Sequence, residues 1–291
     1  MSIQLSCTDF TFHALSHEKA LALIAELDLD YCDLLFFPGC RHVNVDEVRS
    51  APASTAEKIR ERVAAAGLQV ADVLCLFGGY RDLSPSDPDR GVRAESRDAF
   101  ERLLEFCIGV EAHGVTVTPG VEWPGEMRGT ALSRAGEEMA WRVERAASAG
   151  LRLSFEPHVE SITETVDSAL RLCELAPGLT VALDYSHLVY HGIDQTDIER
   201  LHPVTGHVHG RQGGPGALQL PLRLGVIDFQ RVVSGLVESD YEGFLCLEYC
   251  CDHYNDMDRV DTLTETIRLR DLVKAVLAGE AVTQEERYPW D

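Results

Sequence analysis

Four residues of the types that bind divalent metal ions recur at intervals typical of a strand–helix repeat. Each ends or follows a short apolar run, and successive members are 28, 25 and 39 residues apart: Glu156, Asp184, His209 and Glu248. Three carboxylates close together are costly unless a cation neutralises them. Oxygen ligands with one imidazole suit Mn²⁺, Mg²⁺ or Co²⁺ better than a thiolate-type structural zinc site would. We therefore expect one divalent metal ion, with Mn²⁺ favoured and Mg²⁺, Co²⁺ or Zn²⁺ as alternatives.

Further polar and aromatic residues lie near the expected ligands or after neighbouring strands. We expect His187 to act in catalysis by hydrogen bonding a substrate oxygen, and His158 to bind substrate or support a metal ligand. Arg211 either binds an anionic or hydroxyl group of the substrate or is a solvated loop arginine. Trp123, and with it Tyr80, is expected in the pocket wall. The glycine-rich segment 210–224 lacks a nucleotide-binding ending and is either a mobile lid or a plain connection.

The pattern of apolar and amphipathic segments predicts the scaffold that positions these residues. Eight short apolar runs are each followed by a helical pattern, and several runs are continuously apolar, as in strands buried on both faces. This predicts a single α/β domain, a (β/α)8 TIM barrel over residues 1–278, with a C-terminal tail over 279–291. A doubly wound open sheet is the alternative, but Cys7-Thr8-Asp9-Phe10 is not its phosphate-binding loop.

In such a barrel the carboxyl ends of the strands carry the active site. The expected ligands end the fifth to eighth strands, so they should meet at one point. Alternation along the seventh strand suggests that only one of His207 and His209 faces the barrel mouth. Ser161–Glu164 fits a capping box and predicts a helix near Thr163–Leu175.

Composition and charge exclude several classes of protein. The 48 acidic and 26 basic residues give a formal net charge of −22, which repels nucleic acids and anionic membranes. No apolar stretch is long enough for a transmembrane helix, and no secretory signal is recognisable. The nine cysteines are odd in number and scattered, which favours a reducing, cytoplasmic location. The expected partner is a small-molecule substrate.

Four short motifs extend this interpretation: Phe155-Glu156-Pro157-His158, Asp184-Tyr185-Ser186-His187, Gly206-His207-Val208-His209 and Leu247-Glu248. Together they resemble the xylose isomerase-like barrel superfamily of sugar isomerases and epimerases, which includes apurinic-site endonucleases. The resemblance implies that Glu156, Asp184, His209 and Glu248 bind one metal ion, and it selects His209 over His207. It also implies a homo-oligomer, a dimer or tetramer.

The resemblance implies a metal-dependent isomerase or epimerase of a small sugar or hydroxy-carbonyl compound, acting through an enediolate. Glu156 and Glu248 would exchange the roles of base and acid. A dehydratase or lyase using the same site and a non-catalytic metabolite-binding barrel are the alternatives. The endonuclease branch needs extra histidines after the third and fourth strands, where this chain has Phe77-Gly78-Gly79 and Thr118-Pro119-Gly120.

Overall fold

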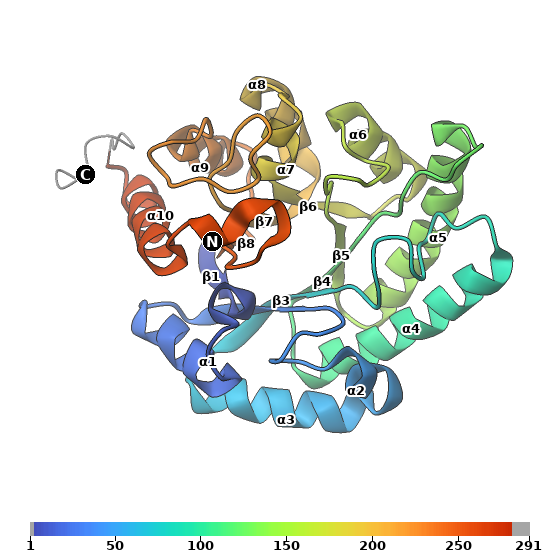
Figure 1. The fold of residues 1–291 in the computed structure, drawn as a ribbon, viewed down its shortest axis with the longest axis horizontal. Helices are drawn as coiled ribbons and strands as arrows, with labels where there is room; N and C mark the ends of the chain where they lie inside the picture. The colour runs from blue at the N-terminus through green and yellow to red at the C-terminus, as the bar shows by residue number, and fades with distance from the viewer. Residues whose placement is uncertain (1–2, 281–291) are drawn as a thin grey trace.

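Residues 3–280, the part of the chain that the computed structural model describes, form a closed barrel of eight parallel strands inside a ring of helices (Figure 1). Each strand pairs with the next along the chain, and the first pairs with the last. This topology confirms the predicted (β/α)8 barrel. The strands are β1 (Gln4–Thr8), β2 (Tyr31–Phe36), β3 (Gln69–Cys75), β4 (Gly114–Val117), β5 (Arg152–Phe155), β6 (Thr180–Asp184), β7 (Thr205–Gly210) and β8 (Phe244–Leu247).

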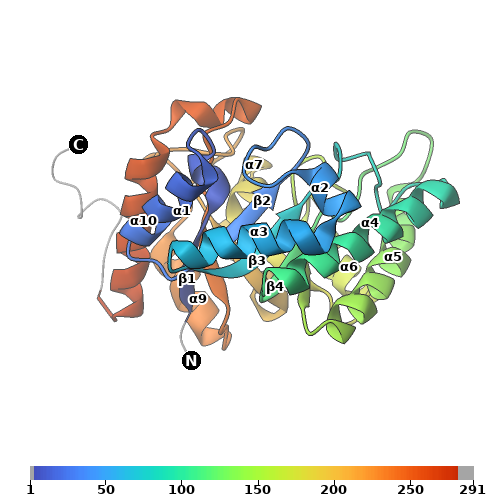
Figure 2. The same ribbon diagram turned by 90° about the horizontal axis from the view of Figure 1, so that it is seen from below.

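The longer helices surround the strands in chain order, as the two views in Figures 1 and 2 show. They cover the outer face of the barrel, so the strands are buried on both sides and are apolar along their length. The helices are α1 (His17–Glu26), α2 (Val45–Ser50), α3 (Pro52–Ala65), α4 (Arg90–Gly109), α5 (Arg128–Ser148), α6 (Val166–Leu175), α7 (Tyr185–Tyr190), α8 (Gln195–Ile198), α9 (Phe229–Glu238) and α10 (Thr262–Leu277).

The main hydrophobic core lies between the strands and the helices. Phe36 of β2 and Phe106 of α4 are both fully buried there, with ring centroids 5.5 Å apart. The barrel interior also holds buried polar side chains. Asp33 accepts a 2.6 Å hydrogen bond from Ser6, and its other carboxylate oxygen lies 2.6 Å from His207 Nε2. This pairing offsets the cost of burying the Asp33 carboxylate.

The start of α6 differs from the predicted position. Thr165 is the N-cap, and its hydroxyl accepts from the Ser168 amide while the Ser168 hydroxyl accepts from the Thr165 amide, both at 3.2 Å. The predicted capping box at Ser161–Glu164 is wrong. Glu164 instead accepts from the Glu160 amide at 3.0 Å, within the loop that precedes the helix.

The last helix, α10, ends at Leu277, and residues 281–291 of the predicted tail lie outside the described residues. Within residues 3–280, no helix combines the length and the apolar character that crossing a membrane requires.

Candidate active site

The carboxyl ends of β5 to β8 bring the four expected metal ligands into the barrel mouth. Asp184 ends β6 and lies in register with His209 of β7, while Glu156 and Glu248 directly follow β5 and β8. The amides of the two glutamates donate to backbone carbonyls of β4 and β7 at 3.1 and 3.0 Å, so neighbouring strands fix both positions. All four side chains are buried.

His209 links the two glutamates. Its Nδ1 lies 2.7 Å from Glu156 Oε1 and 3.6 Å from Glu248 Oε2. Donor atoms of these three residues all lie within 4.8 Å of one another, close enough to share one cation. Glu248 Oε2 and Asp184 Oδ2 are buried and accept no hydrogen bond from any residue that the structure describes. Buried carboxylate oxygens without donors suit a metal ion.

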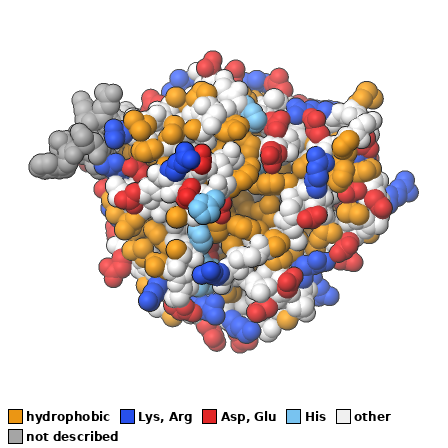
Figure 3. Space-filling model, in the orientation of Figure 1, with side chains coloured by type: hydrophobic (Ala, Val, Ile, Leu, Met, Phe, Trp, Pro, Cys, Tyr) orange, Lys and Arg blue, Asp and Glu red, His pale blue; other side chains and the backbone are white. Residues whose placement is uncertain are grey.

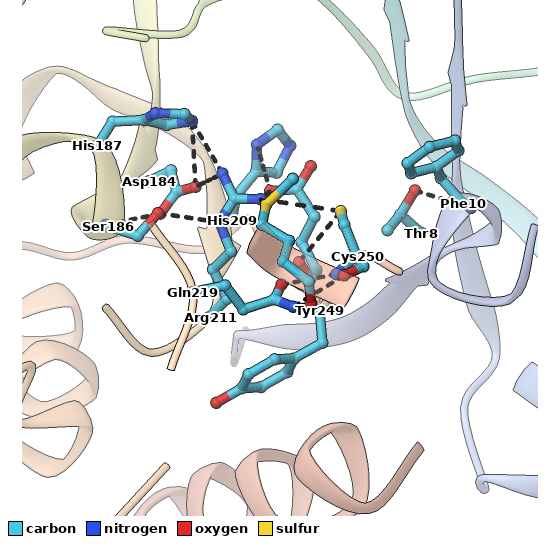
Figure 4. Close-up of polar contacts among 12 residues, drawn as sticks. Thr8, Phe10, Asp184, Ser186, His187, His209, Arg211, Gln219, Tyr249 and Cys250 are labelled. Atoms are coloured by element: carbon cyan, nitrogen blue, oxygen red, sulfur yellow. Dashed lines mark hydrogen bonds and ion pairs between the residues drawn. The ribbon is translucent and has the colours of Figure 1, made fainter. Parts of the chain in front are cut away.

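Arg211 lies inside this group rather than in a solvated loop. Its Nη2 is 2.7 Å from Asp184 Oδ2 (Figure 4). Its Nη1 is 3.8 Å from Glu248 Oε2. Nε donates to the Ser186 hydroxyl at 2.9 Å, and the residue is only 4% exposed. Asp184 therefore faces the Arg211 guanidinium, and the structure excludes the interpretation of Arg211 as a solvated loop arginine.

His207 and His209 both point into the barrel, contrary to our argument from alternation. Residues two apart on a strand lie on the same face, so the two rings occupy successive layers of the interior with centroids 5.1 Å apart. His207 pairs with Asp33, while His209 meets the glutamates. The structure thus places His209 with the other expected ligands, as the resemblance implied.

Two more histidines and a tyrosine complete the polar side of the site. His158 Nδ1 donates to the Val159 carbonyl at 2.7 Å, so its Nε2 accepts from the Tyr80 hydroxyl, also at 2.7 Å. The His187 ring lies against that of His158, with centroids 3.9 Å apart, and its Nε2 accepts from Arg211 at 2.9 Å. His158, His187 and Arg211 therefore lie where we expected substrate contacts.

The electrostatic environment distinguishes the two glutamates. Burial raises the pKa of Glu248 to about 7, against the lowering effects of His209 and Arg211. Burial also raises the pKa of Glu156, but the hydrogen bond with His209 and its charge outweigh burial and lower this pKa to about 2. Burial lowers the pKa of His209, but the Glu248 and Glu156 carboxylates raise it well above its usual value. Without another cation, His209 is the positive partner of Glu156.

A cavity of about 300 Å³ opens onto both glutamates, large enough for a small ligand. Its polar lining includes Glu156, His158, His187, Arg211, Glu248 and Tyr80. The first three strands and their loops contribute an apolar wall of Phe10, Leu35, Phe37, Leu74 and Leu76. Figure 3 shows apolar side chains around the hollow in the middle of this face.

Trp123 lies outside this cavity, contrary to our expectation. Its indole N–H donates to the buried hydroxyl of Ser86 at 3.1 Å, and the Arg81 guanidinium lies 5.4 Å from its ring centroid. Tyr80 supplies the pocket aromatic on this side instead.

The glycine-rich segment is attached to the chain that follows β8. Gln219 Nε2 donates to the carbonyls of Cys250 and Met257, both at 2.8 Å, and Gln219 Oε1 accepts from the Cys250 amide. The sulfur atoms of these two residues lie 3.8 and 3.5 Å from Arg211 Nη1 and help to bury the guanidinium. Sequence reasoning missed Gln219, Cys250 and Met257 because none of them belongs to a recognisable motif.

The donor set fits a divalent cation. Glu156, His209 and Glu248 converge, and the buried Asp184 carboxylate lies beside them against Arg211, the nearby permanent positive charge. One oxygen each of Asp184 and Glu248 accepts no hydrogen bond from any described residue. A metal ion bound by Glu156, Asp184, His209 and Glu248 would neutralise the same carboxylates.

Comparisons with solved structures show the same fold at low sequence identity. D-psicose 3-epimerase from Clostridium cellulolyticum H10, solved with D-tagatose, is 13% identical with a TM-score of 0.75, over 96% of this chain and 100% of that chain. A xylose isomerase-like TIM barrel protein from Mycobacterium smegmatis, solved in complex with magnesium, is 18% identical with a TM-score of 0.70, over 95% and 97%. A probable 3-DHS dehydratase from Bacillus anthracis is 16% identical with a TM-score of 0.66, over 94% and 98%.

No curated protein sequence matches the chain significantly. The family model for the xylose isomerase-like TIM barrel, however, matches residues 21–272, which is most of the chain and includes all nine residues singled out above as candidate site residues. This protein therefore belongs to the xylose isomerase-like TIM barrel family.

Proposed function

We propose that this protein is a divalent-metal-dependent isomerase or epimerase of a small sugar or hydroxy-carbonyl compound. The observation that carries the proposal is the placement of Glu156 and Glu248. They come from different strands, both contact His209, and both line a cavity of suitable size. Two buried carboxylates beside one substrate site can remove a proton from carbon and return it.

The metal would be held by Glu156, Asp184, His209 and Glu248. When bound, it supplies Lewis acidity, which makes the C–H beside a carbonyl easier to deprotonate. The solved magnesium complex of a similar barrel supports a metal in this fold. Mn²⁺ remains our preferred ion, because one imidazole accompanies the oxygen ligands.

The side chains of this chain would then divide the work. Glu156 and Glu248 would exchange the base and acid roles, one removing the proton and the other donating a proton to the opposite face of the carbon. His187 and Arg211 would hydrogen bond substrate oxygens and hold the carbonyl end among the charged residues. The apolar wall offers few hydrogen-bonding groups, so the rest of a bound substrate would contact it mainly through C–H groups.

The test is deuterium exchange from D₂O. Metal-loaded protein is incubated with ketoses, keto-glycosides and other hydroxy-carbonyl compounds, and the products are analysed by mass spectrometry and chromatography. We expect an isomer or epimer of one compound that carries deuterium on the reacting carbon. Glu248→Gln should fail to form it, whereas Glu57→Gln, at an exposed position on α3, should match the wild type. No exchange in any compound, with the metal retained, would favour a binding protein instead.

The Tyr80–His158 pair favours a second candidate, a dehydratase. A tyrosine hydroxyl 2.7 Å from a buried imidazole next to Glu156 could protonate a departing hydroxyl group. In the same experiment a dehydratase would form a product lighter by one water. An epimerase product would keep the elemental composition of its substrate apart from deuterium.

A further inference from the structure

A second group of ligand-type side chains lies outside the cavity of the candidate active site. Asp9 opens the short 3₁₀ helix after β1, His17 is the first residue of α1, and His42 lies in the loop between β2 and α2. Asp9 is fully buried, and both histidines are 4% exposed. Three polar side chains from separate segments are thus enclosed together.

The donor atoms of this group are spaced as metal ligands are, while the two imidazole rings lie stacked with centroids 4.8 Å apart. His17 Nε2 lies 3.3 Å and His42 Nδ1 lies 3.2 Å from the same oxygen, Asp9 Oδ2. Zinc bonds of about 2.0–2.1 Å in tetrahedral geometry place two ligand atoms about 3.3 Å apart. The other Asp9 oxygen accepts from the Leu35 amide at 3.0 Å, which orients the carboxylate.

The proton positions on His42 leave a place for a cation. Its Nε2 lies 3.1 Å from the carbonyl oxygen of Leu15, so Nε2 carries the hydrogen. In a neutral imidazole Nδ1 then has a lone pair, and here it faces the negatively charged Asp9 oxygen. That contact is stable only with a proton or a metal ion between the two atoms. A ring nitrogen donating to a backbone carbonyl is also the usual support of a metal-binding histidine.

His17 distinguishes between a proton and a metal ion at this position. Its side chain is 2% exposed, yet neither ring nitrogen forms a hydrogen bond with any residue that the structure describes. A proton on His42 would satisfy its own contact with Asp9. It would leave His17 Nε2 with only the 3.3 Å contact to the same oxygen and no regular hydrogen bond, and His17 Nδ1 with none, at the cost of buried unsatisfied polar groups. A metal ion would use lone pairs of both rings and the carboxylate at once.

We propose that Asp9, His17 and His42 bind a second divalent metal ion, of the zinc class. Two imidazoles and one carboxylate suit Zn²⁺, Co²⁺ or Fe²⁺ better than Mg²⁺ or Ca²⁺, which prefer oxygen ligands. The ion joins the loop after β1 to the loop after β2. These segments carry Phe10 and Phe37, so the site stabilises the apolar wall of the active-site cavity. This role does not depend on the reaction proposed above.

The test separates the two metal sites with single and double variants. Full-length protein is stripped with a chelator, and His209→Asn removes a ligand of the active site. We expect His209→Asn to bind about one equivalent of Zn²⁺ or Co²⁺, with the visible absorption of Co²⁺ in nitrogen and oxygen ligation. Adding His17→Gln should abolish that equivalent or weaken its affinity on the order of 100-fold or more. His13→Gln is the matched control, because His13 precedes α1 and stacks on Phe10 rather than joining Asp9, His17 and His42.

If the His17→Gln protein folds poorly, thermal unfolding of the other variants still tests the proposal. Because an ion that binds only the folded state stabilises it, Zn²⁺ should raise the Tm of His209→Asn and of His209→Asn/His13→Gln alike. The proposal is overturned if His209→Asn binds no Zn²⁺ or Co²⁺ and shows no shift in Tm. It is equally overturned if a folded His209→Asn/His17→Gln protein binds the ion as tightly as His209→Asn.

Discussion

The Arg211 guanidinium lies 2.7 Å from Asp184 Oδ2, within the set of residues that we propose binds the active-site metal. The same oxygen accepts no regular hydrogen bond among the described residues, so the contact is mainly ionic. Arg211 therefore neutralises a carboxylate that a metal ion would also neutralise. Stability without metal and affinity for metal should depend on this residue in opposite ways.

Arg211→Met tests that relation. Without metal, the variant leaves buried carboxylates without their positive partner, which should lower the free energy of unfolding by about 3 kcal/mol. With Mn²⁺ the variant should be stabilised more than the wild type, because no side-chain cation competes for Asp184. Calorimetric Mn²⁺ titration and thermal unfolding with and without chelator measure both effects. Weaker Mn²⁺ binding in the variant would show that Arg211 supports the metal site instead.

Glu248→Gln should keep the fold and lower turnover by on the order of 10³-fold, because it removes a group that accepts or donates a proton. The fold is checked by circular dichroism, and turnover by the deuterium assay. Metal content is measured in the same samples, since a loss of metal would explain inactivity differently. An active Glu248→Gln protein with wild-type rates would contradict the proposed proton transfer.

Tyr80→Phe distinguishes epimerisation from dehydration. The variant removes the hydroxyl that donates to His158 and keeps the ring in the cavity. If His158 and Tyr80 only hold substrate, kcat/KM should fall about fivefold, the equivalent of about 1 kcal/mol for one hydrogen bond. A loss in kcat of about 100-fold or more would instead identify the pair as a proton donor and favour the dehydratase.

The acid stability of the protein should depend on His202. Its Nε2 lies 2.5 Å from the Tyr185 hydroxyl, and burial lowers its pKa below 6.5. Below pH 6.5 the unfolded chain binds a proton at this position and the folded chain does not, so the free energy of unfolding falls as the pH falls toward the lowered pKa. Between pH 7 and pH 5 the Tm of His202→Gln should fall by less than the Tm of the wild type. His191→Gln, at an exposed position, is the control and should show the same change of Tm with pH as the wild type. If His202→Gln also shows the wild-type change, His202 is not the group responsible.

The barrel and the placement of the four ligand-type residues at the carboxyl ends of neighbouring strands could be predicted because both follow from chain order. Parallel strands place their carboxyl ends together, so a residue such as Glu156 or Glu248 at the end of an apolar run has a defined position. The repeat of strand and helix therefore predicts where such a residue lies in the barrel, even when no side-chain contact is known.

Side-chain directions in loops could not be predicted in the same way. Arg211 directly follows β7, where periodicity no longer determines whether a side chain points inward, and its burial depends on Cys250 and Met257 from the distant β8 loop. Trp123 lies in the loop between β4 and α5, and its indole N–H donates to Ser86 rather than facing the cavity. For α6, two sets of capping residues lie four positions apart, and loop hydrogen bonds to Glu164 decide between them.

The active-site metal is the central claim, and Mn²⁺ titration of the chelator-treated protein tests it most directly. The His17→Gln background removes the second site that we propose. In this background we predict about one equivalent of Mn²⁺, and the double variant His17→Gln/His209→Asn should bind none at the same concentrations. Failure of folded His17→Gln protein to bind Mn²⁺, or one equivalent retained by the double variant, would contradict the account.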